Sequence, residues 1–142
     1  MIPDVAAAFA ELRRRGLIAL RNAGYTQGDG WADVAEHRHR AEQAGQRPRG
    51  GVFYHGQDAA RAREGGPLYI AFGAFVDEPE HEAAAVAVAQ EVVEVLRAHG
   101  FTVVWDGTAG QRIAIQPATP QVAAPPVKSL PIVRKAGTKK RG

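Results

Sequence analysis

The sequence predicts an α+β fold of two layers, with helices mainly on one face of a four-stranded mixed sheet. Residues 3–44 repeat apolar positions every three to four residues, as helices do, whereas residues 52–116 alternate short β-rich runs with helical segments. Residues 117–142 contain five prolines, so we expect no regular helix or strand there. We therefore expect a single domain over residues 1–116 and an extended, Pro-rich basic tail over residues 117–142.

Two N-terminal helices are expected. The first covers residues 3–23, and the second covers residues 31–44 after a glycine-rich loop at 24–30. The first helix is predicted because the following residues recur on one helical face: Val5, Phe9, Leu12, Gly16 and Leu20.

The remaining elements alternate strands and helices. In order they are strand 52–55, helix 57–64, strand 68–75, helix 77–99 and strands 101–105 and 112–116. The longest helix has a sharp predicted start, since Asp77 and Glu80 resemble a capping box, and Gly100 follows it as a stop. We expect a parallel crossover through this helix and an antiparallel final hairpin.

Charge is divided between the two parts of the chain. Up to residue 120 there are 12 arginines and 15 carboxylates, a formal charge of −3; residues 121–142 hold six cations and no acid, a charge of +6. The two sum to the whole-chain charge of +3. The tail residues expected to contact a partner are Lys128, Leu130, Ile132, Val133, Arg134, Lys135, Lys139, Lys140 and Arg141.

This division predicts a non-enzymatic interaction or regulatory domain whose tail contacts an anionic or grooved macromolecule. A nucleic-acid partner would be bound without sequence readout and with strong salt dependence, and a protein partner would accept the apolar stretch 130–133 in a groove. The alternative for the tail is a solvated terminus that aids solubility. A toxin-neutralising, immunity-type protein also fits the small acidic body.

Composition excludes several other classes. The chain has no cysteine, so thiolate metal sites and disulfides are excluded, and no apolar run approaches the length of a membrane span. The N-terminus lacks the basic region of a secretory signal, and the chain has no phosphate-binding or nucleophile-elbow motif. We expect a cytoplasmic protein with no cofactor and no membrane contact; the oligomeric state stays open.

Short motifs of Gly, aromatic and acidic residues recur along the body. They are Gly24-Tyr25-Thr26, Asp29-Gly30-Trp31, Phe53-Tyr54-His55-x-Gln57-Asp58, Tyr69-x-Ala71-Phe72-Gly73 and Trp105-Asp106-Gly107. In these motifs, residues 10–116 resemble a bacterial family of small soluble proteins, a domain of unknown function. The resemblance implies a shared fold and brings with it no activity, cofactor or catalytic residue.

His55, Asp58 and Asp106 are the candidates for catalysis. His55 and Asp58 lie where a strand gives way to a helix, a usual place for ligands in α/β proteins, and Asp106 ends a later strand. A hydrolase or small-molecule binder built on these residues is the second functional hypothesis. The structural alternatives are that Asp58 caps its helix and that Asp106 belongs to a turn.

Tyr25, Trp31, His55 and Gln57 are the candidate ligand-binding residues. Tyr25 and Trp31 flank a glycine-rich stretch, so they form either a binding platform or a clamp that fixes the loop to the core. No metal site is expected. The polar group considered as metal ligands is Asp29, Asp33, His37 and His39. It places only two ligands on one helical face, whereas zinc requires three or four.

Overall fold

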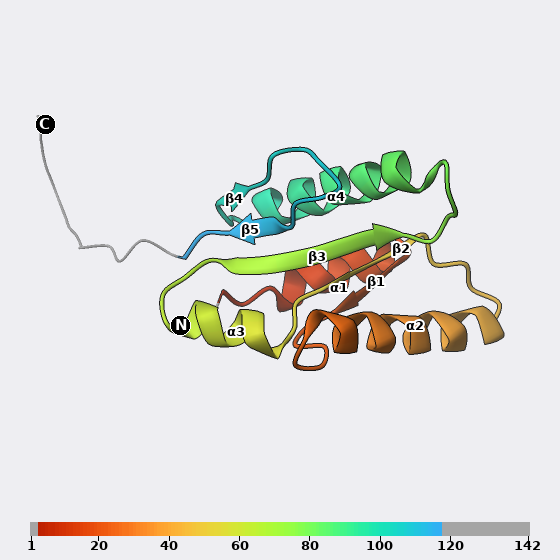
Figure 1. The fold of residues 1–142 in the computed structure, drawn as a ribbon, viewed down its shortest axis with the longest axis horizontal. Coiled ribbons are helices and arrows are strands. Elements are labelled where there is room, and N and C mark those ends of the chain that lie inside the picture. Colours follow the sequence, from red (N-terminus) through yellow and green to blue (C-terminus); the bar gives the residue numbers. More distant parts are fainter. Residues whose placement is uncertain (1–2, 118–142) are drawn as a thin grey trace, which may run out of the picture.

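The computed structural model describes residues 3–117 (Figure 1). The predicted partner-binding residues 128–141 therefore lie outside the described residues. The elements, in chain order, are α1 (Ala6–Arg14), β1 (Leu17–Leu20), α2 (Gln27–Gln43), β2 (Gly50–Phe53), α3 (Gly56–Arg63), β3 (Leu68–Ala74), α4 (His81–Ala98), β4 (Val103–Val104) and β5 (Ile113–Ile115). None of these helices is long and apolar enough to cross a membrane.

The strands form one mixed sheet in the order β1-β2-β3-β5-β4. β1 and β2 are parallel, and every other neighbouring pair is antiparallel. The predicted antiparallel hairpin of the last two strands is confirmed. β3 and β4 run in the same direction, as predicted, but β5 lies between them. The predicted number of four strands is wrong, because the sheet has five.

The additional strand is β1, which lies inside the predicted helix 3–23. The helix ends at Arg14, and Gly16 adopts φ +92°, a left-handed conformation that favours glycine and ends the helix. Leu17 and Ala19 then enter one core and Ile18 and Leu20 border the other, which is the two-residue period of a strand. The stretch is apolar on both faces because the sheet is covered on both faces.

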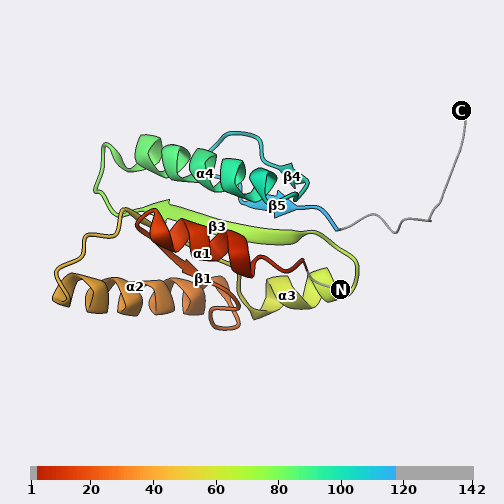
Figure 2. The same cartoon turned by 180° about the vertical axis from the view of Figure 1, so that it is seen from behind.

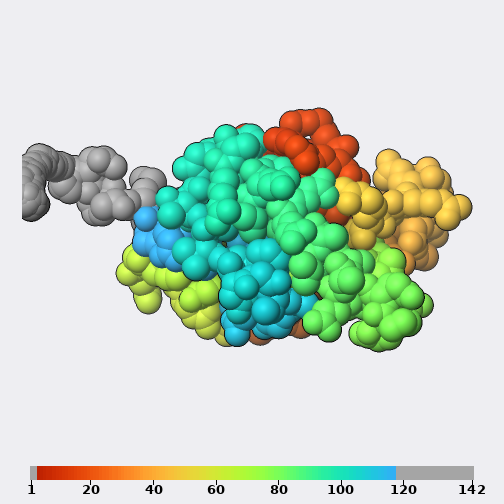
Figure 3. All heavy atoms as spheres, turned by 90° about the horizontal axis from the view of Figure 1, so that it is seen from above, coloured from red at the N-terminus to blue at the C-terminus, as the bar shows by residue number. Residues whose placement is uncertain are grey.

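Three of the four described helices, α1, α3 and α4, contribute to the core on one face of the sheet, in line with the prediction of helices mainly on one face, and α2 covers the other face. The larger core joins α1 and α4 to one face through residues such as Phe9, Ile70 and Leu96. The smaller core joins α2 to the other face, where Val34 packs with Phe53 and Ala71. Figure 1 shows α4 and α2 on opposite sides of β3, and Figure 2 shows α1 in front of β3 when the view is reversed. In Figure 3 the green and teal atoms of α4 and of the segment after it cover much of one side of the molecule.

The helix starts differ from the predicted ones. α2 begins at Gln27, inside the predicted loop 24–30, because Thr26 caps it. α4 begins at His81 and its N-cap Glu80 makes no side-chain hydrogen bond, so the predicted Asp77–Glu80 capping box is wrong. Residues 78–80 form a turn, which separates Asp77 from the helix by several residues.

Candidate functional site

The first junction, residues 21–29, connects β1 to α2. The Thr26 hydroxyl accepts a hydrogen bond from the Asp29 N–H at 3.2 Å, and Asp29 Oδ2 accepts one from the Thr26 N–H at 3.2 Å. These reciprocal bonds are a capping box, which satisfies two backbone donors that helix geometry leaves free. The backbone hydrogen bond from Thr26 holds the pKa of the Asp29 carboxyl below its ordinary value.

The second junction, residues 54–58, connects β2 to α3 by the same arrangement. His55 Nδ1 accepts a hydrogen bond from the Asp58 N–H at 3.3 Å, and Asp58 Oδ2 accepts one from the His55 N–H at 3.2 Å. The N-cap is thus His55, and Asp58 occupies the third helical position. The expectation that Asp58 is the cap is wrong in position, although its carboxylate does take part in capping.

The second junction is buried, and two arginines surround its carboxylate. His55 is 3% exposed and Asp58 is 0% exposed. Arg112 Nη1 lies 3.0 Å from both Asp58 carboxylate oxygens, and Arg61 Nη1 lies 3.4 Å from Oδ1. The Arg112 guanidinium also lies 5.0 Å from the centre of the Tyr69 ring. The buried charge therefore has both ionic partners and backbone donors, as a carboxylate away from water requires.

This environment sets the protonation of His55. Burial lowers its pKa below the ordinary 6.5; the Asp58 carboxylate opposes that shift, while Arg112 adds to it. Because Nδ1 accepts a hydrogen bond, the proton of the neutral ring is on Nε2, which lies 3.3 Å from Asp58 Oδ2. Nδ1 is thus engaged as the cap acceptor, and Nε2 lies close to the Asp58 carboxylate. The buried imidazole of His55 therefore serves as the N-cap of α3.

The two junctions lie side by side because β1 and β2 are parallel neighbours. Gly56 N–H donates to the Gly24 carbonyl at 2.9 Å, and Gln57 N–H donates to the Tyr25 carbonyl at 3.1 Å. Three of the predicted ligand-binding residues, Tyr25, His55 and Gln57, are therefore brought together. Tyr25 is 63% exposed, which makes it the open part of this edge.

Trp31, the fourth predicted ligand-binding residue, lies elsewhere. Its ring packs edge-on to Phe53, with the ring centres 4.9 Å apart. The indole also covers Gly73, where an added Cβ would lie 2.9 Å from the ring. Gly30 is equally constrained, because a Cβ there would overlap Phe53. Of the two alternatives for Trp31, the geometry supports the clamp.

Asp106 belongs to a separate turn. Its Oδ1 accepts hydrogen bonds from the Thr108 N–H at 2.9 Å and the Thr108 hydroxyl at 2.7 Å. The hydroxyl bond is the main reason that the pKa of Asp106 is lowered. Trp105, the residue before it, packs against Phe72 on the face that α1 and α4 cover. Within residues 3–117, Asp106 forms no hydrogen bond or ion pair with His55 or Asp58, so no such bond links the three catalytic candidates.

The polar residues considered as metal ligands also have other partners. His37 Nδ1 donates to the Asp33 carbonyl at 2.9 Å, and Asp29 is part of the first capping box. Among the described residues there is no group of three or more His, Asp or Glu side chains placed to hold a metal ion.

Sequence reasoning missed Thr26 and Asp29 as a cap. It also missed Arg112 as the partner of Asp58 and Tyr69 as the ring against which Arg112 lies. A signal for the caps is present, since Tyr25-Thr26-x-x-Asp29 and Tyr54-His55-x-x-Asp58 share one layout. Arg112 had no local signal, because it is 54 residues from Asp58 in the chain.

The fold and these junctions define a small mixed α/β domain in which two paired capping boxes tie the helices to a parallel strand pair. The chain belongs to the family described as a domain of unknown function, DUF6891, whose family model matches residues 4–122. No curated protein and no solved structure matches the chain.

Proposed function

We propose that this protein is a non-enzymatic interaction domain whose basic tail contacts an anionic macromolecular partner. The observation that carries the proposal is the charge division, −3 for residues 1–120 and +6 for residues 121–142. A cluster of cations attracts polyanions at long range and loses that attraction as salt screens it. A cytoplasmic location is part of the same proposal.

The body supports the non-enzymatic part of the proposal. His55 and Asp58 are buried and bonded to each other, and Asp106 stabilises its own turn. The residues with the best chemistry for catalysis therefore have structural roles, and they do not converge on a common opening.

The test compares three forms of the protein in partner capture at low and high salt. They are the full chain, a chain truncated after residue 120, and a full-length chain in which the six tail cations are replaced by glutamine. We expect capture by the full chain to fall steeply with salt, and both variants to lose it. The glutamine form is the matched control, because it keeps the length and prolines of the tail and removes only charge.

Equal capture by all three forms at every salt concentration would refute the proposal. Loss on truncation but not on glutamine replacement would assign the contact to the apolar stretch 130–133 instead of to charge. Circular dichroism and thermal unfolding of each form establish that the body is still folded.

A second candidate function is a small-molecule or peptide contact at Tyr25. An aromatic side chain that is 63% exposed, next to the backbone of a second helix start, is an apolar surface with a polar tip. Tyr25→Ala would reduce ligand-induced thermal stabilisation in a compound screen. Identical shifts for wild type and Tyr25→Ala would refute this candidate.

A further inference from the structure

A hollow of about 330 Å³ between α2 and the end of β3 carries a further inference. Gly51 and Gly73 face each other in β2 and β3 beneath it, and the absence of side chains there lets the Trp31 ring lie against the sheet. Trp31 and Phe75 are only half-buried, so both rings can still be contacted. The lining includes Trp31, Val34, Ala35, Arg38, Glu42 and Phe75.

The charged side chains of this hollow already have partners. Arg38 lies 4.4 Å from the centre of the Phe75 ring and pairs with Glu42 at 3.0 Å. The hollow therefore offers mainly two aromatic rings, a surface suited to an apolar segment.

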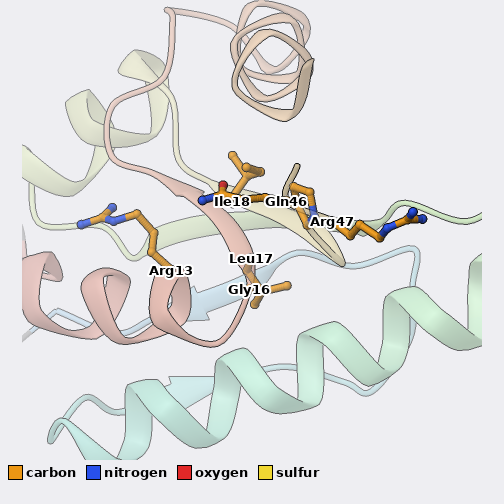
Figure 4. A pocket seen from close by; sticks show the side chains of 7 residues that line it. Arg13, Gly16, Leu17, Ile18, Gln46 and Arg47 are labelled. Atoms are coloured by element: carbon orange, nitrogen blue, oxygen red, sulfur yellow. The ribbon is translucent and has the colours of Figure 1, made fainter. Parts of the chain in front are cut away.

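Another hollow, of about 240 Å³, lies between the end of α1 and the connection from α2 to β2 (Figure 4). Its strand residue Leu17 is 3% exposed, and Arg13 in its wall already donates to the Ala19 carbonyl. Among the described residues, its lining contains no aromatic side chain. The hollow at the end of β3 is therefore the better place for an apolar segment.

The connection from β3 to α4 places negative charge beside the hollow at the end of β3. Residues 76–82, here called the acidic connection, begin directly after Phe75 and contain neither lysine nor arginine. Figures 1 and 2 both show this connection at the end of the molecule where α2 ends. Its four carboxylates are exposed, and within residues 3–117 none of them forms an ion pair; they are Asp77, Glu78, Glu80 and Glu82.

The tail has a sequence that complements this surface. Residues 129–133 read Ser-Leu-Pro-Ile-Val, and Arg134 and Lys135 follow directly, so an apolar stretch precedes cations. Segments that contain proline bind aromatic-lined grooves well, because they are extended before binding and lose little conformational entropy. The cations that follow would be attracted by the acidic connection.

The tail is also long enough to reach the hollow. Ile115 pairs with Leu68, so the described chain ends near the start of β3, whereas the hollow lies at the other end of that strand. The distance along β3 from Leu68 to Phe75 is about 24 Å at the usual rise of a strand. Residues 118–129 can span about 37 Å in a polyproline conformation.

We propose that residues 129–135 dock on the body of their own chain. Residues 130–133 occupy the hollow against Trp31 and Phe75, and Arg134 and Lys135 lie against the acidic connection. The proposal rests on the proposed function and adds regulation to it, because an anionic partner must displace the tail from the body before it can bind.

The first test compares amide spectra of the ¹⁵N-labelled full chain and of the chain truncated after residue 120. Docking predicts differences at the Trp31 indole and at residues 75–82, and these differences should persist after tenfold dilution because both surfaces belong to one chain. Differences that vanish on dilution would assign the contact to a second copy and would refute docking within one chain. Spectra that differ only next to residue 120 would also refute it.

The second test measures the affinity of a peptide of residues 125–142 for the truncated chain. The peptide with Leu130→Ser and Ile132→Ser should bind at least about tenfold more weakly, because it loses the apolar surface that the hollow buries. The full chain should also bind the unaltered peptide at least about tenfold more weakly, because its own tail competes at a millimolar effective concentration.

The hollow is tested by a matched pair of variants on α2. Ala35→Lys fills the hollow and should weaken binding of the peptide about tenfold. His37→Lys adds the same charge two residues further on, where the side chain points to nearly the opposite side of the helix, and should leave binding unchanged. Both positions are exposed, so neither change should disturb the fold.

The acidic connection is tested by a second matched pair. Asp77→Asn with Glu80→Gln should weaken binding about threefold and reduce its dependence on salt. Glu64→Gln with Glu94→Gln removes the same charge from exposed positions elsewhere and should have little effect.

Equal affinities within either matched pair would overturn the proposal. In the full chain, Ala35→Lys should release the tail and raise partner capture at low salt about threefold. Unchanged capture would refute the competition between body and partner.

The capture assay also separates this proposal from the proposed function. If no docking is found while capture still depends on salt and on the six tail cations, the proposed function stands and the docking is wrong. If docking is found while capture does not depend on the tail, the docking stands and the proposed function is wrong.

Discussion

The two strand-to-helix junctions share one sequence layout but differ in their surroundings. Thr26 and Asp29 form an exposed capping box, whereas His55 and Asp58 form a buried one that also binds Arg112. In the first junction, water can replace a lost hydrogen bond. In the second junction, water cannot take the place of a lost hydrogen bond. Removal of one group there would leave its buried partner unsatisfied, which lowers stability. The comparison teaches that burial, and not the capping pattern, determines how much each junction contributes to the free energy of unfolding.

The largest expected effect is that of Asp58→Ala. Removal of the carboxylate leaves Arg112 without its ionic partner and the His55 N–H without its acceptor, at a cost of about 3 kcal/mol in the free energy of unfolding. Urea denaturation measures this. Arg112→Met serves as the matched change on the other side of the pair. A cost for Asp58→Ala no larger than that of Thr26→Ala would break the proposed difference between the junctions.

Gly30→Ala sharpens the comparison, because it tests how the first junction is attached to the core. A Cβ at Gly30 overlaps the Phe53 ring, so we expect a loss of about 2 kcal/mol, in the range for overpacked sites. Gly28→Ala in the same helix is the control. Its nearest atom is 3.9 Å away, so alanine should be neutral or stabilising by up to about 1 kcal/mol. Thermal unfolding that ranks the two variants the other way would contradict the packing described here.

His55 gives the second junction a pH dependence near neutral pH, whereas the pH dependence of the first junction, from the lowered pKa of Asp29, lies in the acid range. Its pKa is lowered in the folded protein, so as the pH falls below about 6.5 the unfolded chain takes up a proton that the folded chain refuses. Stability from this group is thus fully present above pH 6.5 and declines below it. His55→Asn keeps a cap acceptor and cannot titrate, so its unfolding free energy should fall less between pH 7 and pH 5. Parallel curves for the two proteins would contradict the assignment.

Thr26→Ala should have the smallest effect, about 1 kcal/mol, the usual cost of an exposed N-cap. Thr26→Ser, which keeps the hydroxyl, should restore most of it. Chemical denaturation at neutral pH measures both. If Thr26→Ala lowered the free energy of unfolding by much more than His55→Ala, the first junction would contribute more to stability than the second, contrary to this prediction.

Much of the fold follows from local pattern. The last hairpin, the long helix α4 and the central strand β3 were all predicted near their observed positions, because each combines a clear period with glycine boundaries. β1 was not predicted, because Gly16 and Leu20 continue the helical spacing of Phe9 and Leu12. The sequence also carries both capping pairs, but histidine is not among the preferred cap residues, so the likeness between the two junctions was missed.

Sequence alone determines the apolar periods, the glycines at the ends of elements and the separation of charge between body and tail, since these depend on neighbours in the chain. Tertiary structure decided that Leu17–Leu20 is a strand, that α2 covers a second face, and that Arg112 neutralises Asp58. Each of these depends on partners distant in sequence. Hydrogen bonds between strands form only when the fold brings a second strand alongside. The cost of removing a charge from water is offset only when the fold supplies its ionic partner.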